Sequence, residues 1–211
     1  MLERLIEFGF EENFFEIQPL GQLPASCCST PKTLVIDFDK TKARISEESR
    51  LQQPKSADAL KIITHLNRID FIELKGFEMF IKNAKNPGNK NKTVTSQIEK
   101  FNLPKKIKDS LFLLHVLINC KKFHCSNQEL AKFEQVIKGY IVVIDIELKK
   151  VPVKDRLATL TFLSENHNLK EKILTELNNF INCIPESSLE NLAKPRIFNC
   201  NTIDGYYAEI I

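Results

Sequence analysis

Four segments of the chain place apolar residues every three or four positions, the spacing that gives a helix one apolar face. The opening segment has Leu2, Leu5, Ile6 and Phe10 at this spacing, with acidic residues between them. The pattern predicts helices at 1–20, about 95–120, 126–137 and 152–182, and one or two helical turns at 77–85. Pro104 either lies within the second helix or breaks it into two.

Short runs of β-branched, aromatic and other apolar residues alternate with these segments and indicate strands. The runs are TLVIDF at 33–38, SADALKIITHL at 56–66, RIDFIELKGF at 68–77 and GYIVVIDIEL at 139–148. The C-terminal sequence RIFNCNTIDGYYAEII is expected to form one or two further strands, with a turn at Asp204 and Gly205. Gly, Pro and Ser mark 18–32 as a loop, and the polar stretch 39–56 is expected to be an irregular loop or a strand return.

The order of these elements predicts the architecture. A short polar break near Asn67 separates the second and third runs, which predicts an antiparallel hairpin. The strand at 139–148 has helices on both sides, which favours a crossover to a central position in the sheet. We therefore expect an α/β fold with a mixed central β-sheet flanked by helices. The 211 residues suit one domain, with a core at about 1–150 and a helical and strand elaboration at 151–211.

The composition is that of an ordinary globular protein, with 43% hydrophobic and 27% charged residues. No window approaches the run of roughly 18 apolar residues that a membrane-spanning helix needs, so no membrane partner is expected. The acidic N-terminal segment has no small-residue cleavage site, so it is not expected to be a signal peptide. A cytoplasmic location is the resulting expectation.

Six cysteines are scattered along the chain without a C-x-x-C pair, at the spacing of neither a zinc ribbon nor a zinc finger. They are Cys27, Cys28, Cys120, Cys125, Cys183 and Cys200. We expect reduced thiols rather than a structural zinc site. The local cluster of Cys120, His124 and Cys125 is expected to flank the end of a helix.

Asp58, Glu73 and Lys75, all on the predicted hairpin, carry groups suited to metal-dependent hydrolysis. Because a strand has period two, Glu73 and Lys75 share one face while Leu74 points into the core. A hairpin that turns near Asn67 brings Asp58 opposite the end of the second strand. Hydrolysis of a phosphodiester needs a divalent cation held by hard oxygen ligands and a positive charge that neutralises the developing negative charge. The hairpin therefore predicts a metal-dependent site.

The sequence PKSAD ending at Asp58, followed after fourteen residues by ELK from Glu73 to Lys75, resembles the PD-(D/E)xK nuclease superfamily. The resemblance implies that Asp58, Glu73 and the backbone carbonyl of Leu74 bind Mg²⁺ or Mn²⁺. It also implies that Lys75 positions the attacking water or stabilises the transition state. The chain departs from the motif at Pro54, which lies four residues before Asp58 rather than next to it.

The resemblance covers about 30–150 and implies a restriction-endonuclease-like fold and a Mg²⁺-dependent deoxyribonuclease of a bacterial cytoplasm. Many members add a glutamine or an acid from neighbouring helices, and Gln97 and Glu12 occupy comparable places. Gln97 is therefore included among the candidate catalytic residues. No sequence-reading module is apparent, so a partner protein or a homo-oligomer is expected to supply specificity.

A local excess of lysine lies beside the proposed site. Eight lysines occur from Lys82 to Lys108, against one acid within that span. The net charge of the whole chain is only +3, so the argument for a nucleic-acid partner, with DNA favoured, rests on this distribution. A solvated basic face is the alternative interpretation. The candidates for phosphate contacts are the loop at 83–92 and Lys105, Lys106 and Lys108.

A second copy of the I-E-L-K pattern occurs in IDIELKK, at Glu147 and Lys149 with Asp145 in front. This copy lacks a hairpin-spaced upstream acid and a following glycine. The first copy has Gly76 after it, which is expected to let the backbone turn away from the site. We therefore favour the first copy.

A competing motif lies earlier, where Asp37, Asp39 and Thr41 follow an apolar strand as D-x-D-x-T and resemble the haloacid-dehalogenase phosphatases. This resemblance implies that Asp37 is a nucleophile, Asp39 a general acid and Mg²⁺ a cofactor. The second acidic pair which that family uses fits poorly in this chain. A third interpretation is an inactive nuclease-fold protein that binds nucleic acid or a partner. Carboxylates of Asp58 and Glu73 within reach of one metal favour the nuclease, whereas Asp37 and Asp39 facing a later acid favour the phosphatase.

Overall fold

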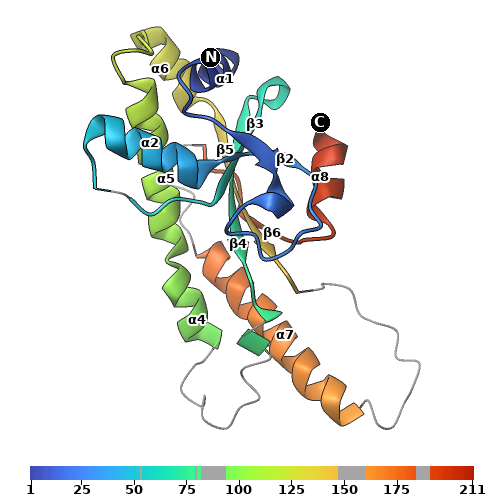
Figure 1. The fold of residues 1–211 in the computed structure, drawn as a ribbon. Helices are drawn as coiled ribbons and strands as arrows, with labels where there is room; N and C mark the ends of the chain where they lie inside the picture. The colour runs from blue at the N-terminus through green and yellow to red at the C-terminus, as the bar shows by residue number, and fades with distance from the viewer. Residues whose placement is uncertain (53, 79, 82–93, 147–159, 184–190) are drawn as a thin grey trace.

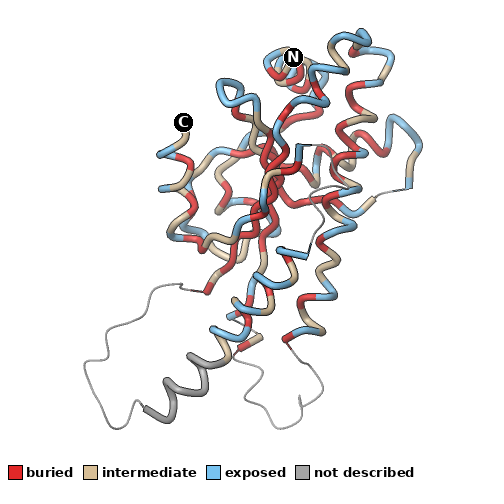
Figure 2. Tube along the Cα trace, turned by 180° about the vertical axis from the view of Figure 1, so that it is seen from behind, coloured by how far each residue is buried: buried red, intermediate tan, exposed pale blue. Residues whose placement is uncertain are grey.

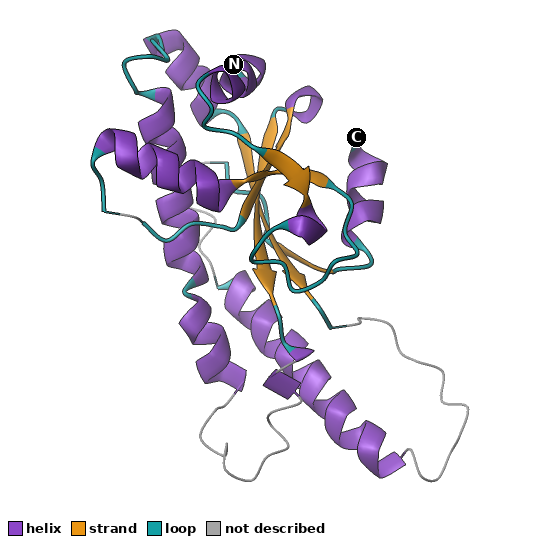
Figure 3. Cartoon of the chain, viewed as in Figure 1, coloured by secondary structure: helices purple, strands orange, loops and turns teal. Residues whose placement is uncertain are grey.

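The computed structural model describes residues 1–52, 54–78, 80–81, 94–146, 160–183 and 191–211. Its centre is a six-stranded mixed β-sheet with helices packed around it (Figure 1; Figure 3). The predicted α/β class with a mixed central sheet is confirmed. Within the described residues, no helix is long and apolar enough to cross a membrane.

The strands lie in the sheet in the order of the sequence. They are β1 (Ile17–Pro19), β2 (Leu34–Asp37), β3 (Ala59–Ile63), β4 (Arg68–Lys75), β5 (Ile137–Ile144) and β6 (Arg196–Asn199). The pairs from β1 to β4 are antiparallel, whereas β5 pairs in parallel with β4 and β6 pairs in parallel with β5. The predicted hairpin and the crossover to an internal strand are both confirmed, and the C-terminal β6 joins the same sheet.

Helices and helical turns connect these strands. They are α1 (Leu2–Glu11), η1 (Leu20–Gln22), α2 (Phe38–Ser49), η2 (Thr64–Leu66), α4 (Val94–Phe101), α5 (Leu103–Ile118), α6 (Asn127–Glu134), α7 (Leu160–Asn182) and α8 (Ile203–Ile210). Residues 78, 80 and 81 are also helical, as predicted for 77–85, of which residues 82–85 lie outside the described part. Of the two alternatives for this segment, the structure shows two helices: Asn102, with a φ of 51°, separates α4 from α5, and Pro104 lies in the first turn of α5.

Two apolar cores lie on opposite faces of the sheet. The larger core joins α1, α2, α5 and α7 to Ile69 and Phe71 on β4. The smaller core joins η1 and α8 to Ile72 and Leu74, which alternate with them on the same strand. Burial along the chain is densest in this central region (Figure 2), and β4 is covered on both faces. The neighbouring β5 is buried over almost its whole length as well, which explains why its sequence is a nearly continuous apolar run.

The polar stretch 39–56 contains most of α2, so the prediction of a loop or strand return there was wrong. Asp37 caps the helix, because its carboxylate accepts a hydrogen bond from the backbone N–H three residues later at 3.0 Å. Phe38, Thr41 and Ile45 are buried at helical spacing. These few buried positions do not stand out in so polar a segment.

The first predicted helix is correct only in its first half. α1 ends at Glu11, and Ile17–Pro19 forms the edge strand β1 instead of continuing the helix. In β1, Ile17 pairs with Ile36 of β2. The chain therefore turns from helix to sheet within a segment whose apolar spacing alone indicates one helix.

The C-terminal prediction was right for β6 and wrong for the residues after it. Ile203–Ile210 forms α8, so the expected turn at Asp204 and Gly205 lies inside a helix. Ile203 and Tyr207, one turn apart, are buried against the sheet. The Tyr207 hydroxyl donates a hydrogen bond to the buried carboxylate of Asp70 at 3.2 Å, which fastens α8 to β4.

Replacing Tyr207 by phenylalanine is expected to lower the free energy of unfolding by about 1 kcal/mol, because a buried carboxylate loses a hydrogen bond. Urea unfolding measures the change. Tyr206→Phe is the matched control, since the Tyr206 ring stacks on Phe198 with 4.6 Å between centroids and its hydroxyl has no hydrogen bond within the described residues. Equal losses in both variants, or none in either, contradict the role given to Asp70.

Candidate active site

The hairpin of β3 and β4 places Asp58 opposite Glu73. Ala59 pairs with Ile72, so Asp58 lies one residue before the first residue of β3. The Asp58 N–H donates to the Ile72 carbonyl at 3.0 Å, which fixes its backbone against β4. The turn falls at Asn67, whose φ is 46°. The predicted geometry of the hairpin is thus confirmed.

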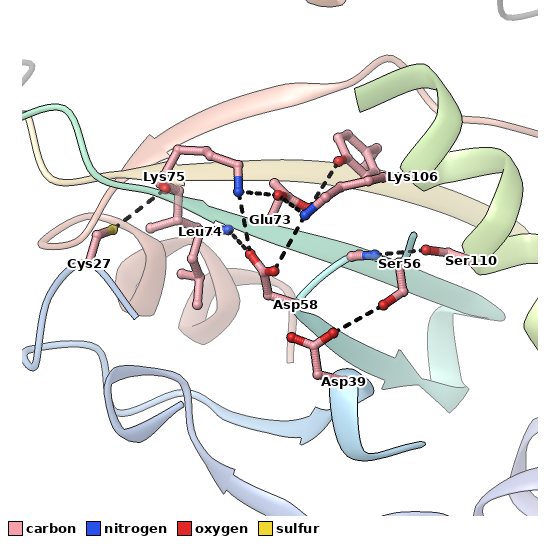
Figure 4. A network of polar contacts seen from close by, with 12 residues as sticks. Cys27, Asp39, Ser56, Asp58, Glu73, Leu74, Lys75, Lys106 and Ser110 are labelled. Atoms are coloured by element: carbon pink, nitrogen blue, oxygen red, sulfur yellow. Dashed lines mark hydrogen bonds and ion pairs between the residues drawn. The ribbon is translucent and has the colours of Figure 1, made fainter. Parts of the chain in front are cut away.

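Two lysines converge on the carboxylates of Asp58 and Glu73 (Figure 4). Lys75 lies on the same face of β4 as Glu73, as period two requires, and its ammonium contacts Glu73 Oε1. Its Nζ also lies 4.0 Å from Asp58 Oδ2. Lys106 reaches the pair from α5, contacting Glu73 Oε1 and lying 3.6 Å from Asp58 Oδ1. Both carboxylates therefore lie beside the same two ammonium groups.

Leu74 directs its backbone toward this site while its side chain enters the smaller core. Its N–H donates to Asp58 Oδ2 at 2.7 Å, because β3 starts opposite Ile72 and provides no backbone acceptor beyond it. The N–H and C=O of a strand residue point toward the same neighbouring strand. The Leu74 carbonyl is therefore directed to the same side as the Asp58 carboxylate, consistent with its predicted part in metal binding.

Burial dominates the electrostatics of the site. Glu73 is completely buried, which raises its pKa, and the negative charge of Asp58 raises it further while Lys75 and Lys106 lower it. Burial acts to lower the pKa of Lys106, but Glu73 and Asp58 outweigh that effect and raise it. The Tyr140 hydroxyl, 3.5 Å from Glu73 Oε2, has its pKa raised well above the usual value, chiefly by burial, so it stays neutral. Two carboxylates and two ammonium groups thus balance in charge.

Lys106 is the site residue whose role the sequence did not predict. Its position near the start of α5 identified it only as a candidate phosphate contact, together with Lys105 and Lys108. Lys105 instead forms an ion pair with Asp109, with 3.3 Å between Nζ and Oδ2, and Lys108 is exposed. The contact of Lys106 with Glu73 depends on how α5 packs against the sheet, which no local pattern encodes. The ammonium of Lys75 also lies over the Phe101 ring of α4, 5.2 Å from its centroid.

The two residues suggested on neighbouring helices do not join this network. Gln97 is partly exposed on α4, and within the described residues no hydrogen bond connects it to Asp58 or Glu73. Glu12 follows α1 and pairs with Lys122, 2.8 Å away, beyond the C-terminal end of α5. The candidate site therefore consists of the hairpin residues and Lys106.

The acids of the D-x-D-x-T motif are held by structural contacts. Asp37 caps α2 and accepts a hydrogen bond from Gln18 Nε2 at 2.8 Å. Asp39 accepts a hydrogen bond from Ser56 Oγ at 3.3 Å and pairs with Lys42. They line a cavity of about 250 Å³ that Asp58 also borders, so the two motifs are neighbours. β2 is antiparallel to both neighbouring strands.

The second I-E-L-K copy is only partly visible, because Glu147 and Lys149 lie outside the described residues. Asp145 accepts hydrogen bonds from the backbone N–H groups of Phe77 and Glu78, at 2.7 and 3.2 Å. It therefore anchors the chain just after Lys75. Gly76 has no positive φ, and a Cβ there would lie 3.3 Å from Asp145 Oδ2, so the glycine serves close packing rather than a left-handed turn.

Comparisons with known proteins provide no assignment: no family model, no curated protein and no solved structure matches this chain. The chemistry of the site therefore rests on its own geometry. Two carboxylates and a backbone carbonyl are hard oxygen donors of the kind that Mg²⁺ and Mn²⁺ accept. The donor set fits such a cation.

A second cluster of reactive side chains lies at the carboxyl ends of the parallel strands. Cys28 and Cys200 form a disulfide, so the expectation of reduced thiols was wrong for this pair. Cys27 lies beside it, and burial raises the pKa of its thiol to about 11. Cys28 and Cys200 are 172 residues apart in the sequence, so no local sequence pattern predicts that they lie together. Cys120 and Cys125 are free thiols between the end of α5 and the start of α6, as expected of residues at a helix end.

Proposed function

We propose that this protein is a metal-dependent nuclease that hydrolyses phosphodiester bonds, with DNA as the favoured substrate. The observation that carries the proposal is the buried pair of carboxylates, Asp58 and Glu73, which share the ammonium groups of Lys75 and Lys106. A solvent-exposed strand edge explains neither the burial of Glu73 nor the convergence of two lysines on it. The arrangement has the parts that phosphodiester hydrolysis requires.

Asp58, Glu73 and the Leu74 carbonyl would hold Mg²⁺ or Mn²⁺. The chemistry expected of such a cation is polarisation of a phosphate oxygen and activation of a water molecule. Lys75 presents its ammonium beside both carboxylates, where it can orient the attacking water or neutralise charge on the phosphate. When substrate and cation are both present, the Lys106 ammonium is expected to leave Glu73 and contact a phosphate oxygen instead. It can do so because its side chain extends from α5 and not from the hairpin that carries the carboxylates.

The topology supports a restriction-endonuclease-like fold as part of the same proposal. β2, β3 and β4 are antiparallel, helices form the crossover, and β5 lies parallel to β4. This is the order of strands and helices that the resemblance implies, with α2 as an addition between β2 and β3. Specificity is proposed to come from a partner protein or a second copy of the chain.

One observation favours a second candidate, a nuclease-fold protein that binds nucleic acid without cutting it. Both carboxylates already have ammonium partners, so the network is complete in charge without a cation. Such a protein is expected to retain a salt-dependent affinity for DNA and to show no cleavage. The cavity that Asp37 and Asp39 share with Asp58 is an observation in favour of the phosphatase, but both acids are held there by structural contacts.

The test is incubation of plasmid and single-stranded DNA with the protein in the presence of Mg²⁺ or Mn²⁺. Lys75→Ala is expected to reduce cleavage by about 100-fold, because a preorganised positive charge is lost while Lys106 remains. Lys132→Ala, which removes an exposed lysine from α6, is the charge-matched control and is expected to cleave like the wild type. Equal cleavage by the wild type and Lys75→Ala contradicts the assignment, and DNA binding without any cleavage favours the second candidate.

A further inference from the structure

Three cysteine sulfurs meet next to the carboxyl ends of β4, β5 and β6. The Sγ atoms of Cys27, Cys28 and Cys200 all lie within 4.8 Å of one another, close enough to hold one metal ion together. Cys27 Sγ is 3.6 Å from Cys28 Sγ and 3.9 Å from Cys200 Sγ. Figure 4 shows Cys27 pointing at the backbone of Lys75. The trio therefore adjoins the candidate active site without belonging to it.

The position of Cys27 matches a metal ligand better than an attacking thiol. Thiol–disulfide exchange needs the incoming sulfur along the line of the bond that breaks. Cys27 is instead nearly equidistant from the two bonded sulfurs, so it lies beside the bond. Tetrahedral zinc with Zn–S bonds of about 2.3 Å separates its sulfurs by about 3.8 Å. Both Sγ–Sγ distances from Cys27 are close to this length. Only the distance between Cys28 Sγ and Cys200 Sγ must therefore increase for the three sulfurs to occupy three corners of a zinc tetrahedron.

The loop that carries Cys27 and Cys28 is held in place by contacts that do not involve sulfur. The carboxylate of Asp204 on α8 accepts hydrogen bonds from the backbone N–H groups of Lys32 and Thr33, both at 2.8 Å. Across the cluster, the Cys200 N–H donates to the Ile144 carbonyl at 3.1 Å. The loop and the strand end thus remain opposed when the disulfide is reduced, and the three thiols stay close together.

We propose that, in the reduced protein, Cys27, Cys28 and Cys200 bind one thiophilic divalent cation, with Zn²⁺ as the best fit. Reduction of the disulfide by a thiol or phosphine supplies two electrons, and metal binding releases the protons of the three thiols. The described residues provide three sulfur ligands, which leaves the fourth tetrahedral position for water or another ligand. The ion would fasten the 26–33 loop to the ends of β5 and β6. This site does not depend on the proposed nuclease activity.

The test uses the full chain, reduced with a phosphine, freed of metal and titrated with Co²⁺. We expect thiolate-to-cobalt charge-transfer absorption that saturates at one equivalent and is displaced by Zn²⁺. Cobalt held by carboxylates lacks this absorption, so the Asp58 and Glu73 site does not interfere. Cys27→Ser and Cys200→Ser are each expected to weaken Zn²⁺ affinity by more than about 100-fold, since even the loss of an outer-shell partner costs 10–100-fold.

Cys183→Ser is the matched control, because Cys183 is an exposed free cysteine on the segment after α7. It is expected to retain the full absorption. Circular dichroism of each variant shows whether its fold is retained, and a folded Cys27→Ser protein with undiminished cobalt absorption overturns the proposal. Absence of the absorption in the reduced wild type overturns it as well and leaves the trio as a plain disulfide with a neighbouring thiol.

Discussion

Replacement of Glu73 by glutamine is expected to reduce metal-dependent cleavage by about 1,000-fold, the upper end of the effect of one preorganised charged group. Glutamine keeps the size of the side chain but removes the negative charge from the centre of the network. Glu73 is completely buried, so no water molecule of the bulk can substitute for it. The loss of cleavage is larger than for Lys75→Ala, because two lysines contact Glu73 and the positive charge of one partly replaces that of the other.

The same substitution is also expected to lower the free energy of unfolding, since it leaves two ammonium groups facing one carboxylate. Removing one member of a buried ion pair costs about 3–5 kcal/mol. The lysine side chains retain 16% and 17% exposure, so water screens part of the remaining charge. We therefore expect a loss of about 2–3 kcal/mol, below that range. Urea unfolding and a cleavage assay on the same preparation measure both effects.

The double variant Glu73→Gln/Lys106→Gln separates chemistry from stability. It restores the balance of charge, with Lys75 facing Asp58, and is expected to recover most of the lost stability. It is not expected to recover cleavage, because one of the two carboxylates is still missing. Recovery of both properties contradicts a chemical role for Glu73, and so does wild-type cleavage by Glu73→Gln alone.

The part of the site that the sequence predicted is the part set by local geometry. A short turn fixes the register of the hairpin, and period two puts Glu73 and Lys75 on one face, so Asp58 could be placed from spacing alone. Lys106 could not, because its contact depends on the packing of α5. The cysteine trio was missed for the same reason, since it forms only when β6 joins the sheet.

The errors in the predicted fold have a similar origin. α2 has a polar sequence, and its few buried residues can be recognised only from their packing against the sheet. Its N-cap residue, Asp37, belongs to a motif that resembles a phosphatase site. α8 contains aromatic residues and an Asp-Gly pair that favour strands and turns, but burial of Ile203 and Tyr207 on the sheet outweighs this local preference. Tertiary packing decided both segments.

Gly139→Ala is expected to lower the free energy of unfolding by about 3–5 kcal/mol, because it combines overpacking with the disruption of a buried ion pair. A Cβ on Gly139 would lie 1.8 Å from Asp70 Oδ1 and 2.7 Å from Arg68 Nη2. Asp70 is fully buried and bonded to Arg68 Nε at 2.6 Å and to the Tyr207 hydroxyl. The carboxylate cannot move away from a methyl group without losing these partners.

Gly205→Ala is the matched control for this substitution. Gly205 lies inside α8 without a positive φ, and a Cβ there would have no heavy atom within 4 Å. Alanine at this position is expected to raise the free energy of unfolding by about 0.5–1 kcal/mol, because it restricts the unfolded chain and favours the helix. Thermal or urea unfolding of the two variants should therefore shift in opposite directions. A Gly139→Ala variant that is as stable as the wild type contradicts the packing of Asp70 against β5, and with it the contact that joins α8, β4 and β5.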